Sequence, residues 1–153
     1  LQINMDYKYK LMFQKCIYFN TWMYIVWLCT AGFFICIKLQ KNDYDQLVKY
    51  LSITLFFMFT IIECLRLYLG QSGNLLSQVP EMAGFLMLSV FMQMPLITYF
   101  LFNPYLMNTP IEVTLHAVMW AIIFLEILLG YWVLKQASTI AKDLYFGLRT
   151  KNG

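Results

Sequence analysis

Charged residues are scarce in this chain of 153 residues, where they make up 12% of the sequence, with 11 Lys and Arg against 8 Asp and Glu. A typical soluble domain carries about 25% charged residues. Hydrophobic residues account for 61% of the chain, so too few polar side chains remain to cover a soluble core. The composition therefore indicates an integral membrane protein. We expect the net charge of +3 to draw the residues beside the membrane toward anionic lipid headgroups. No basic patch indicates a nucleic-acid partner.

The residues that usually build catalytic and metal sites are also few. His116 is the single histidine; one histidine cannot ligate a haem from both sides or build a zinc site, and we expect it near the membrane interface. The four cysteines show no CxxC spacing, and thiols embedded in lipid are not expected to form disulfides. They are Cys16, Cys29, Cys36 and Cys64. No GxSxG, Walker or HExxH motif is present, so we expect no enzyme activity, no cofactor and no metal site.

Four long apolar runs occupy residues 16–37, 48–69, 82–102 and 113–134. Each matches the roughly 20 residues of α-helix that cross a hydrocarbon layer of about 30 Å. The runs are continuous, whereas a barrel strand would alternate over about ten residues. We therefore predict an all-α membrane protein with four transmembrane helices in two antiparallel hairpins. Residues 1–15 form an N-terminal segment, 16–137 the transmembrane domain and 138–153 an amphipathic tail.

Turn and cap residues stand where these spans should end. Gly70 and Gly73 predict a left-handed turn that closes the second helix, and Pro80 with Glu81 suits the first turn of the third. Thr109, Pro110 and Glu112 form a capping-box sequence before the fourth span. Proline and glycine thus favour the same four-span division as the apolar runs.

Basic residues flank the spans unevenly. Eight lie on the side of both termini, namely Lys8, Lys10, Lys15, Arg66, Lys135, Lys142, Arg149 and Lys151. Three lie on the other side, namely Lys38, Lys41 and Lys49. By the positive-inside rule, both termini are expected to be cytoplasmic.

Five polar side chains fall inside the predicted spans, namely Asn20, Glu63, Arg66, Gln93 and Glu126. At about 1.5 Å per helical residue they lie roughly 5–16 Å from the cytoplasmic ends, so they could meet inside the bundle. Arg66 is expected to pair with Glu63 three residues earlier and to snorkel to the headgroups, which would make Arg66→Lys milder than Arg66→Glu. We expect these groups to link helices. The alternative is a proton or ion relay, because intramembrane carboxylates often mark transport paths.

The tail after the fourth span keeps a helical apolar stripe. Its apolar residues stand at positions 134, 137, 140, 141, 144, 145 and 148, while Lys135, Lys142 and Arg149 recur every seven residues. This spacing predicts a helix that lies along the headgroups or against a partner.

One segment joins charged, glycine and proline positions across two spans at fixed spacing. Residues 62–103 read IECLRLYLGQSGNLLSQVPEMAGFLMLSVFMQMPLITYFLFN. They contain I-E-x-x-R-L-Y-L-G-x-x-G-N-L from Ile62, V-P-E-x-A-G-F from Val79 and Q-x-P-L from Gln93. Together with YFNT at 18–21 and Pro110-Ile-Glu before His116, this pattern resembles the transmembrane protein 17 family over roughly residues 14–148.

The resemblance implies a non-enzymatic subunit of the tectonic-like complex in the ciliary transition zone, which restricts membrane-protein diffusion into the cilium and supports ciliogenesis. Its partners would be other integral membrane proteins of that zone and membrane lipids. Glu126 departs from the family pattern, which has no acid there. The structural or partner-binding positions that the resemblance marks are Asn20, Glu63, Arg66, Gly70, Gly73, Asn74, Pro80, Glu81, Gln93 and Pro95.

Composition alone does not separate this function from two alternatives. One is an accessory structural subunit of another large membrane assembly, such as a mitochondrial inner-membrane complex. The other is a small ion or proton carrier that uses Glu63 and Glu126.

Overall fold

The computed structural model describes residues 2–41, 45–76, 79–104 and 109–153, and helices make up almost all of this part of the chain. Its elements are α1 (Gln2–Gln40), α2 (Gln46–Leu76), α3 (Val79–Leu88), the π-helical turn η1 (Ser89–Gln93), α4 (Met94–Phe102) and α5 (Pro110–Asn152). Because α3, η1 and α4 follow one another without a break, they form one helical span. All four resulting helices are long and apolar enough to cross a membrane. The prediction of an all-α, four-span membrane protein is confirmed.

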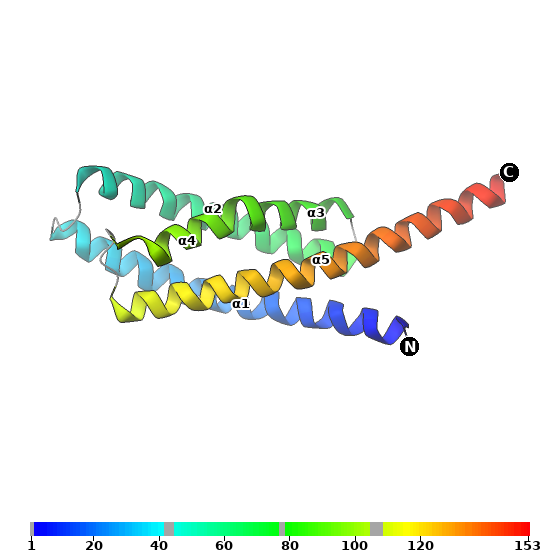
Figure 1. Cartoon of the computed structure of the whole chain (residues 1–153), viewed down its shortest axis with the longest axis horizontal. Helices are drawn as coiled ribbons and strands as arrows, with labels where there is room; N and C mark the ends of the chain where they lie inside the picture. Colours follow the sequence, from blue (N-terminus) through cyan, green and yellow to red (C-terminus); the bar gives the residue numbers. More distant parts are fainter. Residues whose placement is uncertain (1, 42–44, 77–78, 105–108) are drawn as a thin grey trace.

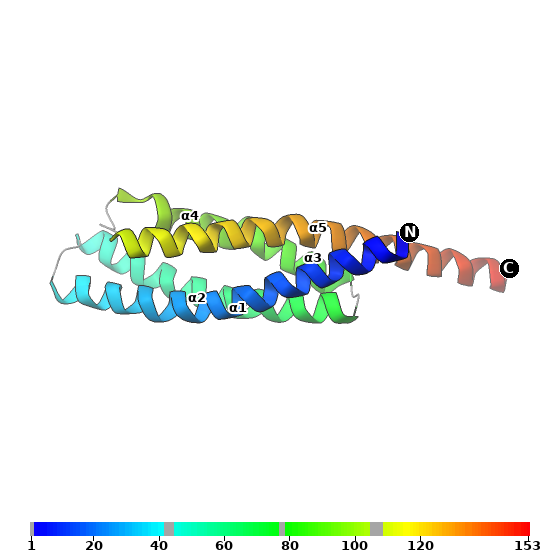
Figure 2. The same ribbon diagram turned by 90° about the horizontal axis from the view of Figure 1, so that it is seen from below.

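The four helices run antiparallel in sequence order, as two hairpins packed side by side (Figures 1 and 2). Within the bundle, α1 contacts α2 and α5, and α3 contacts the same two helices. The start of α1, the end of α2, the start of α3 and the end of α5 lie at one end of the bundle, which we call the terminal end (Figure 1). The helices extend beyond the predicted apolar spans, most of all in α1 and α5, which are 39 and 43 residues long.

The first turns of α5 and α3 show how local sequence fixes the start of a helix. Thr109 caps α5 by accepting a hydrogen bond from the Glu112 backbone, while the Glu112 carboxylate accepts one from the Thr109 backbone at 2.7 Å. Pro110 occupies the first turn, where its missing N–H costs nothing. The predicted capping box is therefore present. Pro80 and Glu81 likewise lie in the first turn of α3, as predicted.

The predicted turn at Gly70 and Gly73 is wrong, because both glycines lie inside α2, which continues to Leu76. They are needed for close packing. A Cβ atom on Gly73 would stand 2.9 Å from the backbone nitrogen of Met82, and one on Gly70 would stand 2.9 Å from the Phe85 ring. The two glycines thus let α2 approach α3 more closely than any other residue would permit.

A π-helical turn interrupts the third span immediately before Pro95. The Met94 N–H donates to the Ser89 carbonyl, five residues earlier, and Pro95 follows as a residue that cannot donate. Such wide turns occur often where a helix must direct particular side chains. Here both Ser89 and Gln93 are fully buried.

Buried apolar residues form two clusters along the bundle axis. One, near the terminal end, contains Phe13, Ile17, Met82, Phe85 and Val133. The other is larger and centres on Trp27, whose ring packs against the rings of Phe56, Phe59 and Phe100. Polar side chains lie between the two clusters, on the helical turns that separate them.

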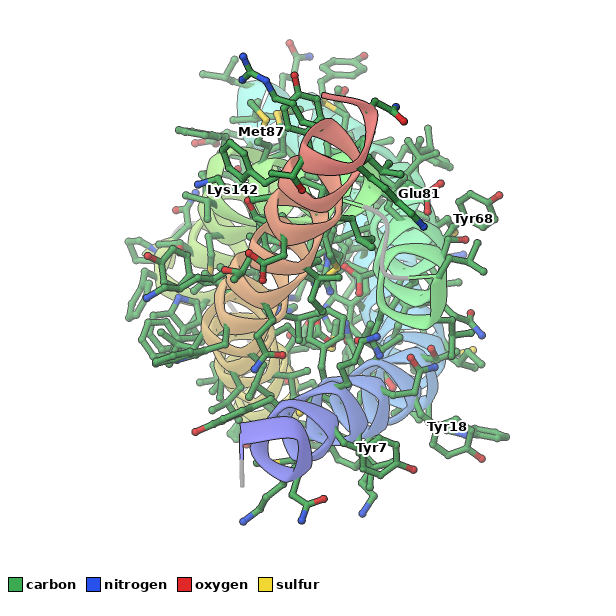
Figure 3. All side chains as sticks on the ribbon, turned by 90° about the vertical axis from the view of Figure 1, so that its right-hand side faces the viewer. Tyr7, Tyr18, Tyr68, Glu81, Met87 and Lys142 are labelled. Atoms are coloured by element: carbon green, nitrogen blue, oxygen red, sulfur yellow. The ribbon has the colours of Figure 1, made fainter. Side chains whose placement is uncertain are left out.

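The outer surface of the bundle is strongly apolar and aromatic. Viewed from the terminal end, Tyr7, Tyr18, Tyr68 and Met87 project outward from different sides (Figure 3). Their exposed fractions range from 61% to 68%. A surface of this kind suits contact with lipid or with other membrane helices.

Candidate functional site: a buried ion cluster

A cluster of polar side chains lies between the two apolar clusters and receives residues from all four helices. We call it the ion cluster; its members are Asn20 of α1, Glu63 and Arg66 of α2, Ser89 and Gln93 of η1, and Glu126 of α5. Every one of these residues has an exposed fraction of 0%. The prediction that the five polar residues of the spans meet inside the bundle is confirmed.

Arg66 is at the centre of the ion cluster. Its Nε and Nη2 donate to the two oxygens of Glu63, at 3.1 and 2.6 Å, in a fork that matches the carboxylate plane. Its Nη1 donates to Glu126 Oε2 and, at 3.4 Å, to the hydroxyl of Ser89. The guanidinium carbon also lies 5.2 Å from the centre of the Phe85 ring. One arginine therefore links α2 to α5 and to the π-helical turn.

Two amide side chains supply further hydrogen-bond donors to the carboxylates, while their own buried oxygens have no partner within the described structure. Asn20 Nδ2 donates to Glu63 Oε1 at 2.7 Å and to Glu126 Oε2 at 3.2 Å, and Gln93 Nε2 donates to Glu63 Oε2. Glu63 thus accepts four hydrogen bonds, two on each oxygen. Glu126 accepts two hydrogen bonds on Oε2, while its buried Oε1 has no partner within the described structure. Both oxygens of Glu63 are therefore hydrogen-bonded, whereas only one oxygen of Glu126 is.

The electrostatics of the ion cluster follow from its burial. Removing ions from water costs several kcal/mol each, and only close pairing with further hydrogen bonds offsets that cost. The cluster sets two carboxylates against one guanidinium, and the amides of Asn20 and Gln93 supply the extra donors. No single helix supplies hydrogen-bond partners for all of its own members of the ion cluster. The polar groups are therefore satisfied best when all four helices assemble in one register.

One sequence-based expectation about this site is wrong. Arg66 does not snorkel, because it is fully buried and paired with both Glu63 and Glu126. Its depth was underestimated because α2 continues to Leu76, seven residues beyond the predicted end at residue 69. Glu126, where the family pattern has no acid, is part of the ion cluster, as its depth along the fourth span predicted. The predicted pair between Glu63 and Arg66, three residues apart, is present.

The remaining predicted site residues lie outside the ion cluster. Asn74 links α2 to α1 near the terminal end, where its amide donates to the Gln14 side chain at 3.0 Å and to the Lys10 carbonyl at 3.2 Å. Gly70 and Gly73 line the contact between α2 and α3. The structure therefore gives these three residues roles in helix packing. Pro80, Glu81 and Pro95 contribute to the first turns of their helices.

Two buried polar contacts were not predicted from the sequence. Trp27 Nε1 donates to His116 Nδ1 at 2.8 Å, and His116 is 3% exposed, so the histidine is a core residue and not an interfacial one. Lys38 forms an ion pair with Glu112 at 2.9 Å near the end opposite the termini. Both pairs join α1 to α5. The sequence indicates only that the two residues of each pair lie at matching depths in α1 and α5. Depth alone does not specify which side chain contacts which.

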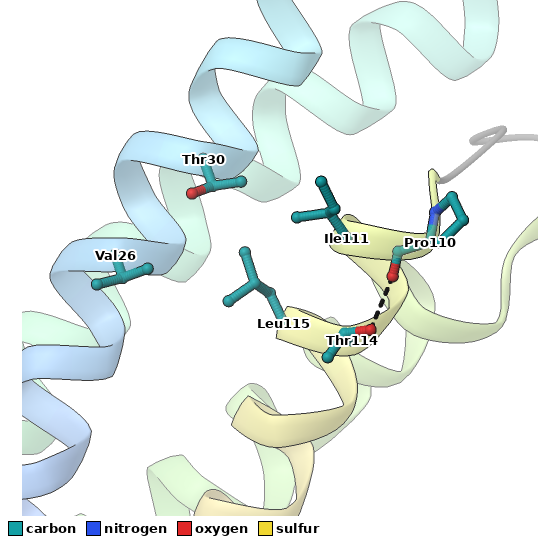
Figure 4. Close-up of a pocket in the computed structure, with 6 residues that line it drawn as sticks. All are labelled: Val26, Thr30, Pro110, Ile111, Thr114 and Leu115. Atoms are coloured by element: carbon teal, nitrogen blue, oxygen red, sulfur yellow. Dashed lines mark hydrogen bonds between the residues drawn. The ribbon is translucent and has the colours of Figure 1, made fainter.

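The surface grooves indicate less about function than the ion cluster does. A groove of about 410 Å³ lies between α1 and the first turns of α5, lined by Val26, Thr30, Pro110, Ile111, Thr114 and Leu115 (Figure 4). The Thr114 hydroxyl donates to the Pro110 carbonyl at 2.8 Å, so it is satisfied within its own helix. Among the described residues, no three His, Cys, Asp or Glu side chains gather as they would around a metal ion.

The fold and the ion cluster together define a class: a four-helix integral membrane protein whose helices are joined by buried ion pairs. Comparison with known proteins narrows this class. Residues 15–123 match the family Transmemb_17, described as "Predicted membrane protein". The chain belongs to this family of transmembrane protein 17 and its relatives.

Individual relatives give the same result. The chain is 36% identical to transmembrane protein 17B of Danio rerio over 135 residues, which cover 88% of the chain and 70% of the relative. It is 33% identical to transmembrane protein 17 of Homo sapiens and 32% identical to that of Bos taurus, each over 126 residues and 82% of the chain. The chain spans 63% of the length of these two mammalian relatives. No solved structure matches it.

Proposed function

We propose that the protein is a non-enzymatic structural subunit of the tectonic-like membrane complex at the ciliary transition zone, where it contributes to the diffusion barrier and to ciliogenesis. The observation that carries this proposal is the complete burial of the ion cluster. Its polar groups are used to join the four helices, and none of its members presents a surface to a substrate. Membership of the transmembrane protein 17 family supports the ciliary assignment.

The outer surface supports a role in assembly. Large apolar side chains such as Trp22, Phe57, Phe91 and Tyr131 are 57–69% exposed on different helices. In lipid, helices associate through close packing and not through hydrophobic exclusion. A compact bundle with such faces can therefore join other membrane helices laterally without changing its interior.

The proposal is tested by locating a tagged copy of the protein in ciliated cells. We expect a ring at the base of the cilium, and we expect the ring to disappear when other membrane proteins of the transition zone are removed. A uniform distribution over the plasma membrane would contradict the proposal. Coincidence with an inner-membrane marker of mitochondria would favour the alternative of a mitochondrial subunit.

The carrier alternative rests on one observation, the partnerless Oε1 of Glu126. Purified protein in sealed vesicles distinguishes the two functions, because a structural subunit should not change the rate of proton entry. We expect the same rate for vesicles with the wild-type protein, with Glu126→Gln and without protein. A faster rate that Glu126→Gln abolishes would favour the carrier.

A further inference from the structure

A second surface hollow lies where α5 passes the start of α3. Its volume is about 480 Å³, and its lining consists of Val79, Ser138, Ala141, Lys142, Tyr145 and Phe146. Val79 is the first residue of α3, and the others belong to α5. In Figures 1 and 2 this part of α5 runs beside the start of α3 and then projects beyond the other helices. We call this site the α3–α5 hollow.

The depth of the α3–α5 hollow places it among the lipid headgroups. Val79 stands three residues before Met82, where the apolar run of the third span begins, and three helical residues rise about 4.5 Å. The headgroup region on each side of a hydrocarbon layer is roughly 5–8 Å thick. On α5, the exposed aromatic residues Tyr131 and Trp132 precede the hollow, and such residues concentrate at the membrane interface. Lipid headgroups therefore surround the hollow in a membrane.

The charges around the hollow favour an anionic ligand. Lys142 is exposed, and the described residues that line the hollow include no acid. Asp143 lies two residues after Ala141, which places it about 200° round α5 from that lining residue. Glu81 lies two residues after Val79, about 200° round α3. These two acids are thus directed away from the hollow, and the charge that faces it is positive.

The same face of α5 carries further basic and hydroxyl groups. Lys135 and Arg149 stand seven residues before and after Lys142, and seven residues make close to two full helical turns. Ser138 and Tyr145, which line the hollow, bring hydroxyl groups that can donate to phosphate oxygens. This side of the hollow is therefore suited to a phosphate group.

The rest of the lining is apolar and comes from Val79, Ala141 and Phe146. A phospholipid combines a charged head with apolar chains, so it matches both parts of the lining, whereas a free phosphate matches only one. An acidic protein segment would have to be brought to this depth by a partner, whereas lipid is present there in any membrane. If the terminal end is cytoplasmic, as the basic residues predict, it faces the leaflet that contains the acidic serine and inositol lipids.

We propose that the α3–α5 hollow binds the headgroup of an acidic phospholipid. Lys142 pairs with the phosphate, the hydroxyls of Ser138 and Tyr145 donate to other headgroup oxygens, and the acyl chains lie along the start of α3. This goes beyond the general attraction of basic residues to anionic lipid, because it assigns one lipid molecule to one site. It does not depend on the ciliary assignment, since it requires only acidic lipid on the side of the termini.

The test uses the full chain in nanodiscs of phosphatidylcholine with a minority of phosphatidylserine, and native mass spectrometry counts the lipids of each kind that stay bound. We expect one phosphatidylserine to be retained in preference to phosphatidylcholine. Lys142→Gln should lower this preference about fivefold, the effect of one lysine near a lipid surface, and Lys142→Arg should retain it. Lys8→Gln is the matched control, because it removes the same charge from an exposed residue of α1 that does not line the hollow.

A second variant tests the shape of the hollow without changing its charge. Ala141→Phe fills the space beside Lys142 and should also lower the preference for phosphatidylserine. Ala141 and Lys142 are both exposed, so neither substitution should change the melting temperature of the bundle. Measuring that temperature for each variant separates loss of the lipid from loss of the fold.

Several outcomes would overturn the inference. Equal losses in Lys142→Gln and Lys8→Gln would reduce the effect to general attraction, and an unchanged preference in Ala141→Phe would show that the hollow holds no lipid. Equal binding of soluble glycerophosphoserine to the chain in pure phosphatidylcholine nanodiscs would assign the site to a free phosphate ester. Photo-cross-linking from residue 142 to a protein and not to lipid would assign it to a partner. The proposed function is judged separately, because a ring at the cilium base without lipid preference rejects only this inference.

Discussion

Arg66 uses every nitrogen of its side-chain head, and this sets what can replace it. A lysine offers one nitrogen, which cannot serve both carboxylates in fork geometry, and full burial prevents it from reaching water. We expect Arg66→Lys to lower the free energy of unfolding by about 2–3 kcal/mol, measured by thermal unfolding in nanodiscs. Arg149→Lys makes the same chemical change on an exposed residue and should leave stability unchanged. Equal melting temperatures for both variants would contradict the central role of Arg66.

This expectation revises the one made from the sequence. An interfacial Arg66 would have tolerated lysine through snorkelling, whereas a buried one does not. Arg66→Glu should still be worse, because it would place three carboxylates in a site without a cation.

The two acids of the ion cluster should respond differently to loss of charge. In Glu126→Gln the new amide nitrogen can take the place of the partnerless Oε1, and the remaining oxygen still accepts from Arg66 and Asn20. In Glu63→Gln either placement puts an amide nitrogen against two donors. We therefore expect Glu126→Gln to cost less than about 1 kcal/mol and Glu63→Gln about 2–4 kcal/mol. Unfolding of both variants in nanodiscs decides this, and equal losses would show that the difference in bonding has no energetic weight.

At the scale of helices, the contact between α2 and α3 depends on small residues. Gly73→Ala would place a Cβ atom 2.9 Å from the backbone nitrogen of Met82, which cannot yield without moving α3. We expect a loss of about 1–3 kcal/mol from this overpacking, measured as a lower melting temperature. Gly84→Ala is the control on the same helix pair, since its Cβ atom would meet only the Leu69 side chain at 3.5 Å. A larger loss in Gly84→Ala would refute the packing argument.

Helix ends that depend on residues within one turn of each other were predicted correctly. The prediction failed where a residue is used in contacts between helices. The capping box at Thr109 and the first turn at Pro80 depend on residues within one turn of each other, and the structure has both. Glycine has two uses, in turns and in close helix contacts, and the sequence around Gly70 and Gly73 did not separate them. The π-helical turn at Ser89–Gln93 was not predicted, and its two buried polar side chains contact Glu63 and Arg66 on another helix.

The same distinction applies to the ion cluster. Depth along each helix predicted that Asn20, Glu63, Arg66, Gln93 and Glu126 could meet, because depth follows from counting residues. Which carboxylate receives which donor depends on helix rotation and register, which no single run of sequence contains. The predicted depth of Arg66 was wrong for a related reason, because it was counted from residue 69 and α2 ends at Leu76.

At the scale of the whole molecule, the structure places both termini at one end of the bundle (Figure 1). Since Arg66 and Lys38 are both buried, seven basic residues remain on that side, against two on the other, Lys41 and Lys49. The seven are Lys8, Lys10, Lys15, Lys135, Lys142, Arg149 and Lys151. The positive-inside rule still predicts cytoplasmic termini. We expect protease added to cells with a permeabilised plasma membrane to remove a C-terminal tag. An N-terminal tag should behave identically, and protection of both tags would reverse the orientation.

The distribution of charge among the helices also bears on how the chain enters the membrane. Glu63 and Arg66 pair within α2, so this helix can enter the bilayer with its own charges matched. Glu126 is the charged member of the ion cluster on α5, which follows the other three spans along the chain, and its cation lies on α2. Until α1, α2 and the third span have come together, that carboxylate has no matched site in the lipid. Incompletely assembled chains therefore display an acid in the bilayer that quality-control factors can recognise, and correct assembly conceals it.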